Sequence, residues 1–107
     1  MPFEALELSL VLVKLLNPIV ALIAKRDVKL ADQIKQARAS VPMCLSEGRR
    51  RKGGDRLHLW RVASGSTEEV QTALRVAEAS EYVSAGMIAE PLDVCDRLLA
   101  MTYRMTT

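Results

Sequence analysis

Apolar residues recur at helical spacing along the first half of the chain. From about residue 4 to 25 they cover most of the helix circumference, so most sides of this first helix need a covering neighbour. From about residue 28 to 51, with Asp27 as an apt N-cap, the apolar positions form a single seam. Its members are three or four residues apart: Leu30, Ile34, Ala37, Val41, Leu45 and Gly48. This spacing predicts a helix that faces a core.

The second half of the chain continues the same pattern. A third helix is predicted over about residues 55–83, with a seam formed by Trp60, Ala63, Thr67, Val70, Leu74 and Ala77. A fourth is predicted over about residues 90–105, with Pro91 at its first position after Ser84-Ala85-Gly86 has ended the third. No stretch alternates as a strand would. We therefore expect an all-α, up-and-down antiparallel four-helix bundle in one domain, residues 1–107.

Several residues interrupt the helical pattern and leave alternatives open. Asn17-Pro18 begins a new helical turn or bends one long helix. Pro42 lies inside the second seam, where proline removes a backbone hydrogen bond. In the third helix, Gly65 predicts the closest helix crossing, because a small residue lets another backbone approach. Alternatively, Ser66 caps a new helix and Glu69 completes a capping box.

Composition and cysteine content exclude several protein classes. Half of the 107 residues are apolar, enough for a real core. The two cysteines, Cys44 and Cys95, do not have the spacing of metal ligands, and we expect no secretory leader. Reduced thiols and a cytoplasmic location are therefore expected. Residues 5–24 are long enough to span a bilayer. Glu7 and Lys14 interrupt them, and we expect no membrane association.

The residues do not combine into a catalytic or metal site. His58 is the only histidine, so we expect a surface or interface residue and no histidine-based metal cluster. Glu47 and Glu69 would suit acid–base chemistry only as a pair. More simply, Glu47 pairs with the arginines that follow it, and Arg38 reaches Glu69. We expect a non-enzymatic protein with no metal and no cofactor.

The formal net charge of +2 is small, but cations gather after the second seam. The cluster consists of Arg49, Arg50, Arg51, Lys52 and Arg56. Such a cluster binds phosphates through counterion release, or it is ordinary solvated charge that stabilises a helix C-terminus. Trp60 follows the cluster and either stacks on a base or packs in the core.

Two separated motifs carry a family resemblance. The run DQIKQARASVPMCLSEG (32–48) is followed by VASGSTEEV (62–70) and then by Tyr82. The chain resembles the 23S ribosomal RNA intervening-sequence protein family, whose patterns read QIRRAAxSIPxNIAEG, IAxGSxxE and GY. The matching structural motif residues are Pro42, Glu47, Gly48, Gly65, Ser66 and Glu69, together with Gln33, Ile34, Ala37 and Ser40. The departures are Cys44 for Asn, Ser46 for Ala and Glu81 for the Gly before Tyr82.

The resemblance implies an assembly and a partner. The family is similar to the accessory protein of diversity-generating retroelements, which forms a basic, barrel-like pentamer, binds nucleic acid and works with a reverse transcriptase. By this likeness we expect a ring-like homo-oligomer of five subunits, which would also cover the apolar first helix. The predicted function is non-specific binding of RNA or DNA through the basic cluster. The alternative is a scaffold or protein-interaction module for an unidentified protein partner.

Overall fold

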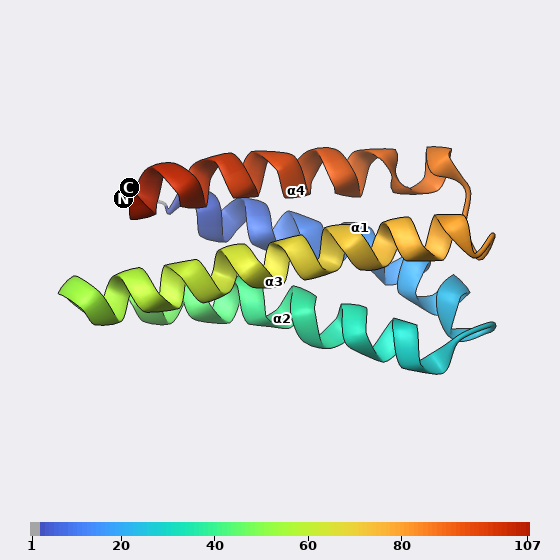
Figure 1. The fold of residues 1–107 in the computed structure, drawn as a ribbon, viewed down its shortest axis with the longest axis horizontal. Coiled ribbons are helices and arrows are strands. Elements are labelled where there is room, and N and C mark those ends of the chain that lie inside the picture. The colour runs from blue at the N-terminus through green and yellow to red at the C-terminus, as the bar shows by residue number, and fades with distance from the viewer. Residues whose placement is uncertain (1–2) are drawn as a thin grey trace.

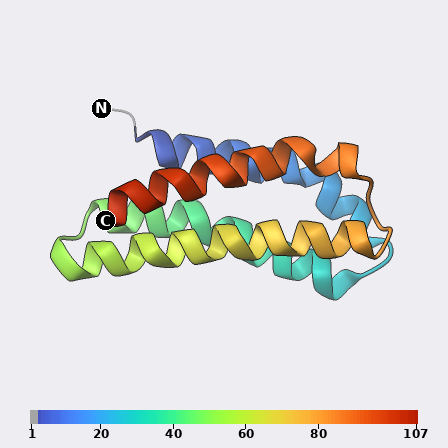
Figure 2. The same cartoon turned by 45° about the horizontal axis from the view of Figure 1, so that its top comes forward.

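The computed structural model describes residues 3–107 and consists of four α-helices. They are α1 (Glu4–Ala24), α2 (Val28–Arg49), α3 (Gly53–Ala79) and α4 (Ala85–Thr106). Each helix packs against the helix before it and the helix after it, and α1 also packs against α4. The result is an up-and-down antiparallel bundle, as predicted, 42 Å long and 22 by 21 Å across (Figure 1). The α2–α3 turn lies at the same end as both termini (Figure 2).

The predicted core seams are confirmed. In α2 all six seam residues are buried, and in α3 all are buried except Trp60, which is half-buried. Asp27 caps α2, because its Oδ1 accepts a hydrogen bond from the Leu30 amide at 3.0 Å. The helix continues without interruption through Pro42.

The first helix, α1, is also continuous through Asn17-Pro18. Arg38 crosses from α2 to α1 at this point. One guanidinium nitrogen donates to Asn17 Oδ1 at 2.9 Å and to the Val13 carbonyl at 3.2 Å. The expected pairing of Arg38 with Glu69 is therefore wrong. By length and composition α1 could span a membrane. Its most apolar 18-residue window has a mean hydropathy of 2.0, and 33% of that window is buried inside the bundle.

The predicted boundaries between α3 and α4 are wrong. α3 ends at Ala79, and Glu81 follows in the left-handed region with φ of 63°. The amide of Glu81 donates to the Glu78 carbonyl and that of Tyr82 donates to the Ala77 carbonyl, both at 2.9 Å. These two bonds form a Schellman motif. Ser84 then caps α4, so Ser84-Ala85-Gly86 begins a helix instead of ending one.

Pro91 consequently lies inside α4, where it is buried, and not at the first helical position. Tyr82 joins this turn to the α1–α2 turn. Its hydroxyl donates to Asp27 Oδ2 at 3.3 Å, and the Arg26 guanidinium lies 5.6 Å from its ring centre. The two turns at this end of the bundle are thus held together by side chains.

The glycine predictions also need correction. A Cβ on Gly65 would meet no atom within 4 Å, so this residue is not the closest crossing. Of the five glycines, Gly48 is the one with close neighbours, since a Cβ there would lie 2.6 Å from two atoms of the Trp60 ring. Ser66 does not begin a new helix, because α3 runs unbroken from Gly53 to Ala79. Its hydroxyl instead donates to Ser40 Oγ of α2 at 2.9 Å.

Candidate functional site

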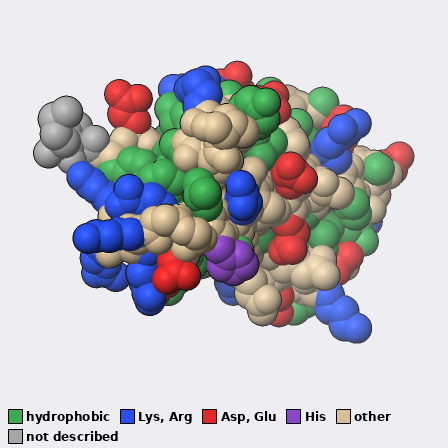
Figure 3. Space-filling view, turned by 60° about the vertical axis from the view of Figure 1, so that its left-hand side comes forward, with side chains coloured by type: hydrophobic (Ala, Val, Ile, Leu, Met, Phe, Trp, Pro, Cys, Tyr) green, Lys and Arg blue, Asp and Glu red, His purple; other side chains and the backbone are tan. Residues whose placement is uncertain are grey.

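The basic cluster lies at the α2–α3 turn, at one end of the bundle. Its five members end α2, form the turn and enter the first helical turns of α3. Figure 3 looks toward this end and shows Lys and Arg side chains gathered on one side of the face. All are exposed except Arg56, which is half-buried. The structure thus brings the predicted cations together, partly because four of them are consecutive in the sequence.

Arg56 holds the turn together from inside. Its Nε donates to the Gly48 carbonyl at 3.1 Å, and its Nη2 donates to the Arg49 carbonyl at 2.8 Å. Carbonyls at a helix C-terminus lack intrahelical partners, so this guanidinium satisfies the last turn of α2. The same guanidinium lies 5.2 Å from the Trp60 ring centre.

Trp60 is a packing residue at this end. Its Nε1 donates to the Leu45 carbonyl at 3.2 Å, and its ring lies against Gly48. Phe3 lies 5.9 Å from it, between ring centres, and the Arg49 guanidinium lies 5.3 Å from the centre of the Phe3 ring. With Arg56 and Phe3 both beside its ring, Trp60 is poorly placed to stack on a base.

The remaining cations differ in how they are engaged. Arg51 Nη2 lies 3.0 Å from Glu47 Oε1, the pairing predicted from their spacing. Within residues 3–107, the side chains of Arg50 and Lys52 make no hydrogen bond, ion pair or ring contact. Both therefore remain available to an anionic ligand.

The first turn of α3 adds to the positive field of the cluster. No side chain caps it, and Gly53 and Gly54 have open space around them. Unpaired amides at a helix N-terminus carry partial positive charge. His58 is exposed near this turn and lines a small groove of about 210 Å³ with Glu47, Arg51 and Asp55.

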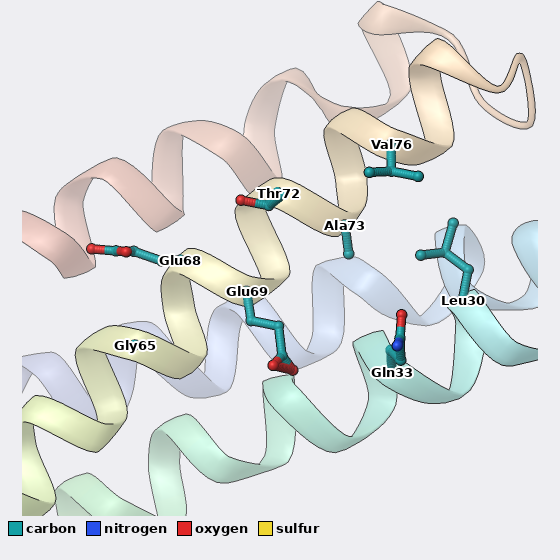
Figure 4. A pocket seen from close by; sticks show the side chains of 8 residues that line it. All are labelled: Leu30, Gln33, Gly65, Glu68, Glu69, Thr72, Ala73 and Val76. Carbon is teal, nitrogen blue, oxygen red and sulfur yellow. The ribbon is translucent and has the colours of Figure 1, made fainter.

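The two motif segments, 32–48 and 62–70, meet between α2 and α3. Beside the Ser40–Ser66 bond, a groove of about 490 Å³ runs along the outside of the two helices. In Figure 4, Glu69 points from α3 toward α2, and Gln33 lies opposite on α2. The groove is lined by Leu30, Gln33, Gly65, Glu68, Glu69, Thr72, Ala73 and Val76. It contains carboxylates but no nucleophile paired with a base.

Neither cysteine forms a reactive centre with neighbouring groups. Burial raises the pKa of the Cys95 thiol to about 12, and the charge of Asp96 acts in the same direction. Cys44 is half-buried, with its Sγ 3.7 Å from Ser40 Oγ. Among the described residues, no group of three or more His, Cys, Asp or Glu side chains is placed to hold a metal ion.

Comparison with family models gives a match over most of the chain. The family model described as 23S rRNA-intervening sequence protein matches residues 3–104. The chain belongs to this 23S rRNA-intervening sequence protein family. Comparisons with curated proteins and with solved structures give no match. In this member of the family, the Glu47-Gly48 motif lies against Trp60 and Arg51, and the Gly65-Ser66 motif faces α2 through Ser66.

Sequence reasoning missed the contacts that cross the bundle. The approach of Phe3 to Arg49, and of Arg56 to the end of α2, joins residues from different helices or turns. The sequence carries no signal for the Phe3–Arg49 contact, because the two residues are far apart along the chain, and for Arg56 the only signal was an arginine close after the end of α2. The contact between Tyr82 and Asp27 had a stronger sequence signal, since Tyr82 is part of the family pattern.

Proposed function

We propose that this protein is a non-enzymatic, cytoplasmic bundle protein that binds RNA or DNA without sequence preference through the basic cluster at the α2–α3 turn. The single observation that carries the proposal is the availability of Arg50 and Lys52 beside a turn fixed by Arg56. Phosphate contacts by such cations release counterions and depend little on sequence. Arg49 and Arg51 extend the positive surface on either side.

The proposed assembly is a homo-oligomeric ring, with five subunits as in the accessory protein of diversity-generating retroelements that the family resembles. The surface of α1 supports self-association. Only a third of its most apolar window is buried, and Val11 is 45% exposed. Apolar surface of this kind on a small bundle is most simply covered by another subunit.

Nucleic-acid binding is tested with labelled RNA and duplex DNA of mixed sequence, titrated at several salt concentrations. The test variant is Arg50→Ala with Lys52→Ala. The matched control is Lys25→Ala with Lys29→Ala, which removes two exposed cations at the opposite end of the bundle. The slope of log affinity against log salt should fall by about 0.9 for each lost phosphate contact in the test variant. It should not change in the control.

Two results would contradict the proposal. One is absence of binding by the unmodified protein at low salt. The other is an equal loss of affinity in the two double variants, because binding would then depend on overall charge and not on this turn.

A protein-docking scaffold is the second candidate function, and the groove between α1 and α4 favours it. This groove has a volume of about 320 Å³ and a mostly apolar lining that includes Leu15, Pro18, Leu22 and Met87. Met87 is 51% exposed there. A flexible, exposed methionine suits a docking surface. A low-salt pull-down that retains RNA but no protein would count against this candidate.

A further inference from the structure

The outer face of α2 carries a regular stripe of residues on the side opposite the core. The intervals along it are four, three, four, three and four residues, the spacing of a coiled-coil seam. Five of its six members are exposed and Ser46 is half-buried. The stripe consists of Asp32, Gln36, Ala39, Met43, Ser46 and Arg50.

The stripe is complementary to itself when read in the opposite direction. If two copies of α2 lie antiparallel about a two-fold axis level with residue 41, each member meets a different member of the same stripe. Asp32 then faces Arg50, Gln36 faces Ser46 and Ala39 faces Met43. These are an opposite-charge pair, two hydrogen-bonding side chains, and a small residue opposite a large one. A two-fold interface requires this kind of self-complementarity.

The apolar centre of the stripe is open to a partner. Met43 is 69% exposed, the highest value among the large apolar side chains of the described residues. Met43 lines a groove of about 530 Å³ together with Pro42 and Arg50. Leu10 of α1 is 47% exposed and lines this groove from the other side. Residues 32–39 of an antiparallel second copy would lie over this groove.

The charged ends of the stripe favour a second copy over other partners. Asp32 makes only an exposed contact with Lys35 at 4.0 Å, and such pairs contribute little. The side chain of Arg50 makes no hydrogen bond, ion pair or ring contact with another described residue. An anionic polymer would be repelled by Asp32, and a lipid surface would not take the polar residues on both sides of Met43.

We propose that two copies of this chain associate through α2, antiparallel about a two-fold axis, with Met43 packed on the partner's Ala39 and Arg50 paired with the partner's Asp32. This contact goes beyond the proposed function, since a ring joins two different surfaces whereas this stripe pairs with itself. In a ring-forming protein it would join two rings. In a protein without a ring it would give a dimer.

The test is the mass of the whole chain in solution, by light scattering after size exclusion, for the unmodified protein and four variants. Met43→Glu places a charge at the centre of the contact. Val76→Glu is the matched control, since Val76 is 46% exposed on α3, away from the stripe. Asp32→Lys and the double variant Asp32→Lys with Arg50→Glu test the charge pair. Circular dichroism checks that each variant is folded.

The unmodified protein and the Val76→Glu control should have twice the mass of Met43→Glu, whether the smaller species is a single chain or a ring. Asp32→Lys should raise the dissociation constant at least about tenfold, because it places like charges together. The double variant restores opposite charges at both symmetric positions, so it should regain the larger mass. Equal masses for the unmodified protein and Met43→Glu would overturn the proposal, as would failure of the double variant to recover. Asp32 and Met43 lie outside the basic cluster, so the Met43→Glu and Asp32→Lys results do not depend on nucleic-acid binding. The double variant changes Arg50, which belongs to the cluster, so its mass is measured in the absence of nucleic acid.

Discussion

Replacing Glu81 with glycine should stabilise the bundle. Glu81 occupies the position after the C-cap of α3 with φ of 63°, and its amide is bonded in the Schellman motif. Glycine is the residue that adopts this conformation without a steric penalty. The family pattern has glycine at this place before the tyrosine, and the structure shows why that residue type fits.

The size of the effect follows from two opposing terms. Relief of the left-handed conformation is worth about 1–2 kcal/mol for a residue with a Cβ. The greater freedom of glycine in the unfolded chain costs about 0.4–1 kcal/mol. The net gain in unfolding free energy therefore lies between about 0 and 1.6 kcal/mol, with a midpoint of about 0.8 kcal/mol. For a domain of this size, that midpoint corresponds to a rise of roughly 2–6 °C in Tm.

The assay is thermal and urea unfolding followed by circular dichroism, with Glu81→Ala as the control. Alanine removes the same charge but keeps the Cβ, so it should change the unfolding free energy by no more than about 0.5 kcal/mol. The difference in unfolding free energy between Glu81→Gly and Glu81→Ala measures the cost of the left-handed backbone at this position. If Glu81→Gly is no more stable than Glu81→Ala, the left-handed conformation does not strain this chain and the reasoning is wrong.

Three further predictions concern buried contacts, each measured by urea or thermal unfolding. Gly48→Ala should lower the unfolding free energy by about 1–3 kcal/mol, because the new Cβ overlaps the Trp60 ring; Gly65→Ala, with open space, should not. Tyr82→Phe should cost about 0.5–1.5 kcal/mol through loss of the hydrogen bond to Asp27. Burial raises the pKa of the Cys95 thiol from 9.0 to about 12. The stability that the buried neutral thiol gives the fold is therefore fully present below pH 9 and is lost as the pH rises toward 12. Cys95→Ala should lack this part of the alkaline destabilisation.

Each of these predictions has an outcome that would contradict it. If Gly48→Ala and Gly65→Ala have the same unfolding free energy, the Trp60 ring does not restrict the residue at position 48. An unchanged Tyr82→Phe variant would mean that the two turns are not held together by the hydroxyl. Identical alkaline profiles with and without Cys95 would mean that its thiol does not titrate differently in the folded chain.

The helices could be predicted from the sequence because their signal is local and repeated. The six seam residues of α2 are all buried, together with Ala31, and Asp27 marks the beginning of the helix. The α3–α4 turn could not be predicted in the same way. A helix end is normally marked by glycine at the left-handed position, and here Glu81 occupies it. The nearest glycine, Gly86, predicts a helix end by its residue type, but it lies inside α4.

The two motif glycines show a second limit. Gly48 and Gly65 are the same residue type in the same kind of helix, and both were expected to matter. Periodicity places Gly48 in the buried seam of α2 and leaves Gly65 outside the seam of α3, but it does not show that the Trp60 ring lies on Gly48 while Gly65 faces open space. A contact between residues twelve positions apart on different helices depends on how α2 and α3 cross, which periodicity does not determine.

The basic turn has a structural reason to exist whether or not a ligand binds it. Cations near the end of α2 stabilise its exposed carbonyls, and Arg56 does so directly through two hydrogen bonds. The presence of five cations is therefore weak support for phosphate binding by itself. The stronger argument comes from the cations that the fold does not use. Arg56 already secures the turn through two hydrogen bonds, whereas the side chains of Arg50 and Lys52 make no hydrogen bond or ion pair with a described residue. Their removal should therefore change the unfolding free energy little, and a loss of nucleic-acid binding by a variant that stays folded would report on the ligand.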